Sequence, residues 1–265
     1  YLGYSATSGS EAIDYIIADH TLINNDDKSE YSENIIYMPH TFMPNDFKNI
    51  KLQNNLKRKD FGLSDNSFVF CCFNKQYKFT PFLFDIWMDL LKEVEKSSLW
   101  LLVSNNQTVK NLIKETEKRN IDPNRVVFAH GQPLEQHLSR HSLADLFLDT
   151  FPYGAHTTCG DALWSGLPVL TLRGNTFASR VSSSLLKAIN LEELITNSLD
   201  EYKSLAINLA KNPQKLIEIK KKLKINKDKT PLFNTKNYTK NLETAYKSVY
   251  KRYNENSTFD DIIIK

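Results

Sequence analysis

The sequence predicts an α/β fold in which a doubly wound parallel sheet is covered by helices on both faces. Two observations predict it: short runs that are apolar throughout recur along the chain, and amphipathic segments of helical length separate most of them. Strands of a parallel sheet are buried on both faces, so they form continuous apolar runs instead of alternating ones. Such runs occupy residues 68–73, 99–104, 125–130, 145–150 and 168–172.

Helices are predicted between these runs and again in the last third of the chain. The segments between the runs cover residues 81–96, 108–119, 135–141 and 158–165. Beyond them, four stretches have helical character, at residues 178–190, 199–212, 213–226 and 235–253. In the last stretch, Tyr238, Leu242, Tyr246 and Val249 have the spacing of one helix face, which predicts that this face packs against the protein.

Two short strands are predicted before this lobe, at residues 13–19 and 34–39, and a polar, basic stretch at 48–67 indicates a linker. We therefore expect three parts. Residues 1–59 are the end of an incomplete N-terminal lobe, residues 60–230 are a Rossmann-like lobe, and residues 231–265 are a helix and tail that pack back toward the N-terminal lobe. Because the chain begins with Tyr1 instead of Met, we expect a segment upstream to be missing.

The composition excludes several classes of protein. The formal net charge is only +3 and 25% of residues are charged, which argues against disorder and against a dedicated nucleic-acid-binding surface. The lysines of residues 215–229 are expected to form a solvated helix face. The three cysteines lack the spacing of a disulfide framework or a metal site, which indicates a reducing, cytoplasmic environment. No apolar stretch approaches the roughly 20 residues that span a bilayer, so no membrane partner is expected.

Ligands of open α/β sheets bind beyond the carboxyl ends of the strands, so the loops after the apolar runs are candidate sites. The first such loop carries Lys75 and Lys78, followed by Thr80 and Pro81 as a helix N-cap and first helical residue. Two ammonium groups beside a helix N-terminus favour an anion, which predicts a phosphate contact. The alternative is an exposed lysine loop with an ordinary helix cap.

The second loop follows the run at residues 125–130. It carries Gln132, and His137 and Arg140 follow three residues apart on one helix face. An imidazole ring can stack on a flat nucleobase while a guanidinium or an amide bonds to the edge of that base. The alternative is that both residues are exposed on the helix without a ligand.

The third loop follows the run at residues 145–150 and contains the segment YGAHTTCGDALWSG. Two small residues before His156 allow the backbone to approach a ligand closely, and His156, Thr157 and Thr158 can donate hydrogen bonds to phosphate oxygens. Asp161 can accept hydrogen bonds from ribose hydroxyls. The alternative is structural: Thr158 and Asp161 have the spacing of a capping box, which explains those two residues but not His156.

Several common signatures are absent from the sequence. It contains no G-x-x-x-x-G-K-[ST] phosphate loop, no G-x-G-x-x-G and no G-x-S-x-G. It also lacks the Asp-x-Asp pair through which nucleotide-sugar enzymes often hold a metal. A bound diphosphate would therefore be met by Lys78, His156 and helix N-termini, and no metal or other cofactor is predicted.

With these loops in place, the sequence resembles the catalytic region of the O-linked N-acetylglucosamine transferase family, which includes the plant Spindly proteins. The resemblance extends from residue 2 to about residue 253. It rests on segments that occur in the order of the family: LGYSATSG, DYIIAD, YSENIIYMPHTF, FNKQYK, HLSRHSLADLFLDT, GAHTTCGDALWSGLPVLTL, ASRVSSSLL and PLFNTKNYT.

The resemblance implies a GT-B fold, in which two Rossmann-like lobes hold the nucleotide sugar between them, and an inverting transfer that needs no metal. It implies that Lys78 contacts the diphosphate and is the catalytic candidate of this chain. It further implies that His156, Thr157 and Thr158 contact phosphate and that Asp161 binds ribose.

His137 and Arg140 match family residues that pack on uracil and bond to it. The chain departs from the family at Lys75, Leu134 and Tyr153, which stand where a glutamine, a lysine and a cysteine are expected. The complete set predicted to bind the nucleotide sugar is Lys75, Lys78, Gln132, His137, Arg140, His156, Thr157, Thr158 and Asp161.

The predicted function is therefore transfer of N-acetylglucosamine from UDP to serine or threonine hydroxyls of proteins. The expected partners are the nucleotide-sugar donor and a protein or peptide acceptor, which the family recruits through helical repeats upstream of the catalytic region. Alternatives remain open: Spindly-like use of GDP-fucose, N-linked or small-molecule glycosylation, or a nucleotide-binding or interaction module that is catalytically incomplete. We expect the 265-residue chain alone to bind UDP weakly and to transfer poorly.

Overall fold

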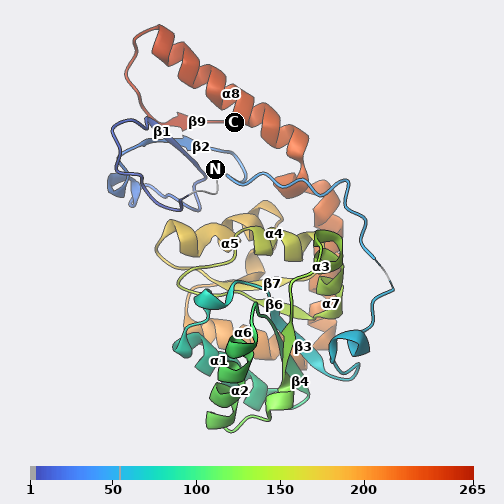
Figure 1. The fold of residues 1–265 in the computed structure, drawn as a ribbon. Helices are drawn as coiled ribbons and strands as arrows, with labels where there is room; N and C mark the ends of the chain where they lie inside the picture. Colours follow the sequence, from blue (N-terminus) through green and yellow to red (C-terminus); the bar gives the residue numbers. More distant parts are fainter. Residues whose placement is uncertain (1–3, 54) are drawn as a thin grey trace.

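The residues described by the structure, a computed structural model covering 4–53 and 55–265, form two sheets (Figure 1). The larger sheet has strand order β5-β4-β3-β6-β7-β8, and the smaller has the order β1-β2-β9. The paired strands within each are parallel. The predicted α/β fold is confirmed. Of the predicted first domain, residues 1–3 and residue 54 lie outside the described residues.

Five strands of the larger sheet coincide with the predicted apolar runs: β3 (Phe68–Cys72), β4 (Ser97–Leu102), β5 (Val126–Ala129), β6 (Leu146–Leu148) and β7 (Val169–Leu172). Their side chains are mostly buried because helices cover both faces of the sheet. A sixth strand, β8 (Ile195–Thr196), was not predicted, since two residues are too few to give a periodic signal.

The winding of the larger sheet reverses at its centre. From β3 the chain moves outward through β4 to β5, returns to β6 beside β3, and then moves outward on the other side through β7 to β8. The loops beyond β3 and β6 therefore lead away from each other, and such a point leaves a crevice at the carboxyl ends of the two strands.

Seven helices belong to this lobe within the described residues: α1 (Pro81–Glu93), α2 (Asn106–Lys118), α3 (Leu134–Arg140), α4 (Thr157–Trp164), α5 (Phe177–Ala188), α6 (Leu199–Lys211) and α7 (Pro213–Lys229). Helix α1 packs against α6, while α4 packs against both α3 and α5. The predicted start of α1 is confirmed, because the Thr80 side chain accepts a hydrogen bond from the Leu83 N–H and Pro81 is the first helical residue.

The smaller sheet combines the two ends of the chain. Strand β2 (Asn34–Tyr37) pairs with β1 (Tyr15–Ala18) on one side and with β9 (Ile262–Ile263) on the other. Helix α8 (Thr235–Asn254) lies along this sheet in Figure 1, and its Ala245, Leu242 and Val249 pack with the apolar side chains of β2 and β9. The predicted apolar face of α8 is wrong at Tyr246, which is 56% exposed. Strand β9 was not predicted.

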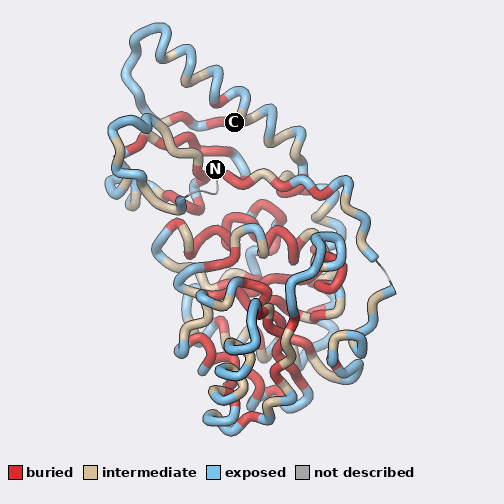
Figure 2. The backbone as a smooth tube through the Cα atoms, in the orientation of Figure 1, coloured by how far each residue is buried: buried red, intermediate tan, exposed pale blue. Residues whose placement is uncertain are grey.

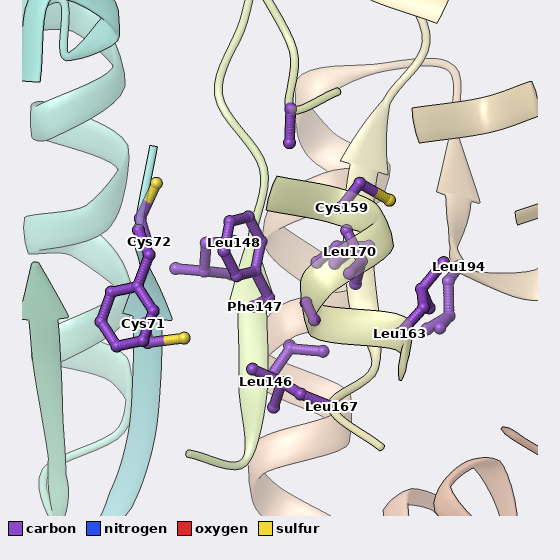
Figure 3. Packing of buried hydrophobic residues seen from close by; sticks show 14 of the residues in the cluster. Cys71, Cys72, Leu146, Phe147, Leu148, Cys159, Leu163, Leu167, Leu170 and Leu194 are labelled. Atoms are coloured by element: carbon purple, nitrogen blue, oxygen red, sulfur yellow. The ribbon is translucent and has the colours of Figure 1, made fainter. Parts of the chain in front are cut away.

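The two lobes share one apolar core. Among the described residues, one cluster of buried side chains runs from Ala18 and Ile35 in the smaller lobe to the centre of the larger lobe. Figure 2 marks the backbone of buried residues in red in both lobes. Figure 3 shows Phe147 and Leu148 of β6 between Cys72 of β3 and Cys159 of α4. Burial raises the pKa of the Cys72 and Cys159 thiols, so neither is poised as a thiolate.

Polar contacts also join the lobes. Arg180 of α5 donates from Nη1 to the Leu22 carbonyl at 3.1 Å and pairs with the Asp27 carboxylate. Ser184, one turn further along α5, donates to Asp19 at the end of β1 at 2.6 Å. Because Arg180 and Asp19 are buried, these bonds satisfy groups that would be costly to leave without a partner. No helix of the described residues is long and apolar enough to cross a membrane.

Candidate functional site

A cavity of about 380 Å³ lies at the carboxyl ends of β3 and β6, where the winding of the sheet reverses. Three loops meet there: the one after β3, the one after β6 and the start of α3. The residues that line it are Phe73, Asn74, Lys75, Tyr77, Lys78, Leu102, His137, Tyr153, His156, Thr157 and Thr158. Acidic side chains do not occur among them, so the described wall of the cavity favours an anion.

The buried carboxylate of Asp149 organises the loops at the floor of this cavity. Its Oδ1 accepts hydrogen bonds from the N–H of Thr150 at 2.8 Å, the N–H of Ala155 at 2.6 Å and the Asn74 side chain at 3.3 Å. Its Oδ2 accepts from the Thr171 hydroxyl on β7 at 2.7 Å. One carboxylate thus ties together the ends of three neighbouring strands, β3, β6 and β7.

Lys78 projects into the cavity from a short 3₁₀ turn, Gln76–Lys78, between β3 and α1. Its Nζ donates a hydrogen bond to the Gly154 carbonyl at 2.7 Å and lies 3.8 Å from the centre of the Tyr153 ring. Partial burial lowers the pKa of Lys78, an effect that the nearby charge of Asp149 opposes. Neither close partner of the ammonium carries a negative charge.

Helix α4 begins at the cavity with its first N–H groups unpaired inside the helix. Thr157 and Thr158 are its first two residues, so their N–H groups have no acceptor in the preceding turn. The hydroxyl of Thr158 donates to the Asn74 side chain. His156, which precedes the helix, contacts the Ala178 carbonyl through Nε2 at 3.2 Å; because a carbonyl only accepts, Nε2 is the protonated nitrogen.

The capping box considered for Thr158 and Asp161 is wrong. Helix α4 begins at Thr157, two residues earlier than that arrangement requires, and His156 at the cap position makes no side-chain cap. Thr158 is committed to Asn74, 84 positions away in the chain. The Asp161 carboxyl is 7% exposed and has no hydrogen-bond partner among the described residues, so desolvation raises its pKa to about 7.

His137 and Arg140 are held together as predicted for one helix face, but they are not both exposed. The guanidinium Nη2 of Arg140 lies 2.5 Å from His137 Nδ1, and Nη1 donates to the His130 carbonyl at 2.7 Å. Arg140 is 1% exposed and lies 4.7 Å from the centre of the Phe73 ring. The alternative of two exposed helix residues is therefore wrong for Arg140.

The partner of His137 determines which of its nitrogens carries the proton. A guanidinium only donates, so His137 Nδ1 must accept, and the neutral ring is protonated on Nε2. Burial and the charge of Arg140 lower the pKa of His137 to about 4, so the ring is neutral at pH 7. The ring can therefore offer a flat face and one N–H donor to a ligand. Behind it, buried His141 packs edge-on against both His137 and Phe73.

The remaining predicted residues are placed differently. Lys75 lines the cavity, but it is exposed, and its ammonium group has no hydrogen bond or ion pair among the described residues. Gln132 is exposed outside the cavity wall, and Asp161 and Arg140 lie behind that wall. The cavity therefore brings together the lysines, His137, His156 and the two threonines of the predicted set.

Three further residues shape the site, although the sequence did not single them out for it. Asn74 and Asp149 support the loops from below, and Tyr153, seen in the sequence only as a departure from the family, covers Lys78. The sequence contained a signal that could have identified Asp149, because a carboxylate at the end of a fully apolar run is unusual for a buried strand.

Two lobes of parallel strands with a cavity at the reversal point of the larger one define the GT-B class of glycosyltransferase fold. This class is confirmed by an O-GlcNAc transferase of Thermobaculum terrenum, to which this chain is similar with a TM-score of 0.84 and 27% sequence identity. The match covers 93% of this chain and 46% of that one. An Anabaena protein solved in complex with UDP shares the fold at a TM-score of 0.56 and 16% identity.

The chain belongs to glycosyl transferase family 41, whose sequence profile matches residues 1–57 and 51–242. It is 36% identical over 253 residues to an Arabidopsis thaliana protein named as a probable UDP-N-acetylglucosamine–peptide N-acetylglucosaminyltransferase, SEC. It is 30% identical over 260 residues to a tomato protein given the same probable activity, SPINDLY. The resemblance predicted from the sequence is confirmed. The two matches cover 93% and 96% of this chain but only 26% and 27% of those proteins.

Proposed function

We propose that the chain forms the donor-binding part of an inverting, metal-independent glycosyltransferase that moves N-acetylglucosamine from UDP-GlcNAc to serine or threonine hydroxyls of proteins. The observation that carries this proposal is the cavity at the reversal point of the sheet. Lys78, His156 and the first N–H groups of α4 converge there without a carboxylate in the described wall. The donor and acceptor classes come from the relatives, which are named for them.

The geometry suits a departing diphosphate. As the bond between the sugar and UDP breaks, negative charge grows on the β-phosphate, and donors fixed beside it stabilise the transition state more than the ground state. In this proposal Lys78 and the N–H groups of Thr157 and Thr158 supply those donors, while the Nε2 proton of His156 is already engaged by the Ala178 carbonyl. Among the described residues, no group of three or more histidine, cysteine, aspartate or glutamate side chains is arranged to hold a metal ion.

The nucleobase would lie at the other end of the cavity, against the face of His137. We propose that the ring stacks on uracil, while the Nε2 proton of His137, which lies in the plane of the ring, meets an acceptor beside the stacked base. Arg140 then acts from behind, by fixing that tautomer. Asp161 needs a movement or a ligand-induced contact to reach a ribose, because it lies beneath the cavity wall.

Calorimetry of the chain with UDP, GDP and the two corresponding nucleotide sugars tests the proposal. We expect UDP to bind more tightly than GDP, and UDP-GlcNAc to be the donor consumed when the protein in its full encoded length meets a peptide acceptor. Tighter binding of GDP would instead favour a fucose donor. UDP binding without transfer by the full-length protein would favour a nucleotide-binding module.

A further inference from the structure

The Lys78 ammonium is held by two neutral groups that come from neighbouring residues of the same loop. Its Nζ donates to the Gly154 carbonyl at 2.7 Å and lies 3.8 Å from the centre of the Tyr153 ring. An aromatic face attracts a cation through its quadrupole, and a carbonyl does so through its dipole. Both groups stabilise the positive charge without cancelling it.

The carboxylate whose charge acts on Lys78 is Asp149, and its oxygens already accept hydrogen bonds from other groups. Its two oxygens accept the four hydrogen bonds described above, from Thr150, Ala155, Asn74 and Thr171. An ion pair between Lys78 and Asp149 is not formed; the charge of Asp149 acts on Lys78 from a distance and favours its protonated form. The cation therefore stays available to a ligand.

The loop that holds Lys78 is itself fixed. The Gly154 N–H donates to the Ala178 carbonyl at 3.1 Å, and the Thr150 hydroxyl donates to the Tyr153 carbonyl at 2.7 Å. A side chain at position 154 would approach Asp149 Oδ2 and the Ala178 carbonyl within 3.3 Å, so glycine suits this tight passage. The loop leads directly into His156 and α4, so the Lys78 ammonium bound to it is held at a fixed distance from the N–H groups at the start of α4.

We propose that Tyr153 is a positioning residue, which holds the Lys78 ammonium beside His156 and the start of α4 in a charged, pre-oriented state for the diphosphate of the donor. This inference rests on the proposed function and assigns a role to a residue that the sequence marked only as a departure from its family. Tyr153 also packs edge-on against His156, with 5.1 Å between ring centres, so its ring contacts both Lys78 and His156.

This arrangement favours ligand binding because the Lys78 side chain has already lost conformational freedom before the ligand binds. A free lysine side chain pays a large conformational cost when it is fixed on a ligand. An ammonium also has three donors, and a carbonyl and a ring face leave at least one of them for a phosphate oxygen. If the Tyr153 ring instead blocked the phosphate site, removing the ring would tighten UDP binding. The two cases therefore predict changes of opposite sign in the affinity for UDP.

The test compares Tyr153→Leu, which removes the ring, with Tyr153→Phe, which keeps it. Binding of UDP and of uridine to the chain is measured by calorimetry or by NMR titration. We expect Tyr153→Leu to weaken UDP binding about tenfold and to leave uridine binding within twofold of wild type. Tyr153→Phe should bind both ligands like wild type, because the ring face remains.

A matched control is Tyr246→Leu, which removes an exposed tyrosine from α8 in the smaller lobe and should change neither affinity. Equal losses for UDP and uridine in Tyr153→Leu would indicate general damage and overturn the inference. So would unchanged or tighter UDP binding. Wild-type protein that binds no nucleoside diphosphate would instead remove the proposed function, and the inference with it.

Discussion

The cavity has two ends that are built differently. At the Lys78 end, loops are held by hydrogen bonds that converge on one buried carboxylate, Asp149, whose acceptor sites are filled from β3, β6 and β7. At the His137 end, the wall is a stack of rings, in which Phe73 and His141 pack edge-on and Arg140 lies over Phe73. The first end keeps charges exposed to a ligand, whereas the second buries a charge behind a neutral ring.

This difference shows how one cavity can treat the two halves of a nucleotide separately. A phosphate needs fixed donors with net positive charge, and the hydrogen-bonded loops supply a rigid frame for them. A base needs a flat surface and one or two directed donors, and the ring stack supplies these. Four measurements test whether the two ends of the cavity differ in this way.

The largest effect should come from removing the carboxylate that supports the Lys78 end. Asp149→Ala leaves the N–H groups of Thr150 and Ala155 and the Thr171 hydroxyl without their acceptor in a buried region, so we expect a loss of about 4 kcal/mol in the free energy of unfolding. Urea titration measures this loss. Thr171→Val removes one of these bonds and should cost about 1 kcal/mol. Similar losses in the two variants would contradict a shared carboxylate.

The next effect concerns the charge itself. Lys78→Ala should reduce transfer by the full-length protein at least a hundredfold, corresponding to about 3 kcal/mol of barrier, because a donor to the leaving phosphate is lost. Steady-state kinetics with UDP-GlcNAc and a peptide acceptor provide the measurement. Lys75→Ala is the comparison, since the Lys75 ammonium lines the same cavity but is exposed and has no partner among the described residues. Equal effects of the two variants would mean that only the overall positive charge matters.

The two ends should also respond to acid in opposite ways. Desolvation raises the pKa of Asp161, beside the Lys78 end, from 3.8 to about 7. Between these values the folded state retains a proton that the unfolded state loses. The stability contributed by this group therefore falls as the pH rises from 3.8 to about 7. Burial lowers the pKa values of His137 and His141 from 6.5 to about 4 and about 3, so stability from these groups falls as pH drops below 6.5.

Asp161→Asn removes only the first contribution. Between pH 6.5 and 4.5 we expect this variant to lose stability faster than wild type, by up to about 1.4 kcal/mol per pH unit. Urea unfolding at several pH values measures the difference. Parallel curves for the two proteins would show that Asp161 is ionised in the folded state.

The smallest effect is expected at the ring stack. His137→Ala should weaken binding of UDP and uridine to the same extent, about tenfold, because the base loses a stacking partner that the phosphates do not use. Gln132→Ala should change both affinities less than twofold, since Gln132 is exposed outside the cavity wall. A loss confined to UDP in His137→Ala would move His137 to the phosphate half of the ligand.

The sequence predicted the parts of the molecule that depend on local patterns. Continuous apolar runs predicted β3 to β7, and Thr80 with Pro81 predicted the start of α1. The capping box considered for Thr158 was wrong because the hydroxyl of this residue bonds to Asn74 instead of capping the helix, and Asn74 lies at the end of another strand. Local spacing contains no information about such a choice.

The same reason explains the residues that were missed. Asp149 and Tyr153 act through contacts between β3, β6 and β7, which exist only once the strand order is known. Strand β9 consists of two residues and depends on β2, more than two hundred positions earlier. Lys78, His137, His156 and the threonines were predicted because their chemistry is conspicuous at strand ends, where the fold class already places ligands.

The pairing of β9 with β2 means that the backbone passes between the lobes twice. Lys51 and Lys57 lie exposed in the first passage, where trypsin can reach the chain. A cut at either residue would leave β1 and β2 in one fragment and β9, α8 and the larger lobe in the other. The two fragments would remain joined by the shared strand ladder and by the interlobe core. The molecule is thus a candidate for assembly from two separately expressed pieces, divided in the first passage.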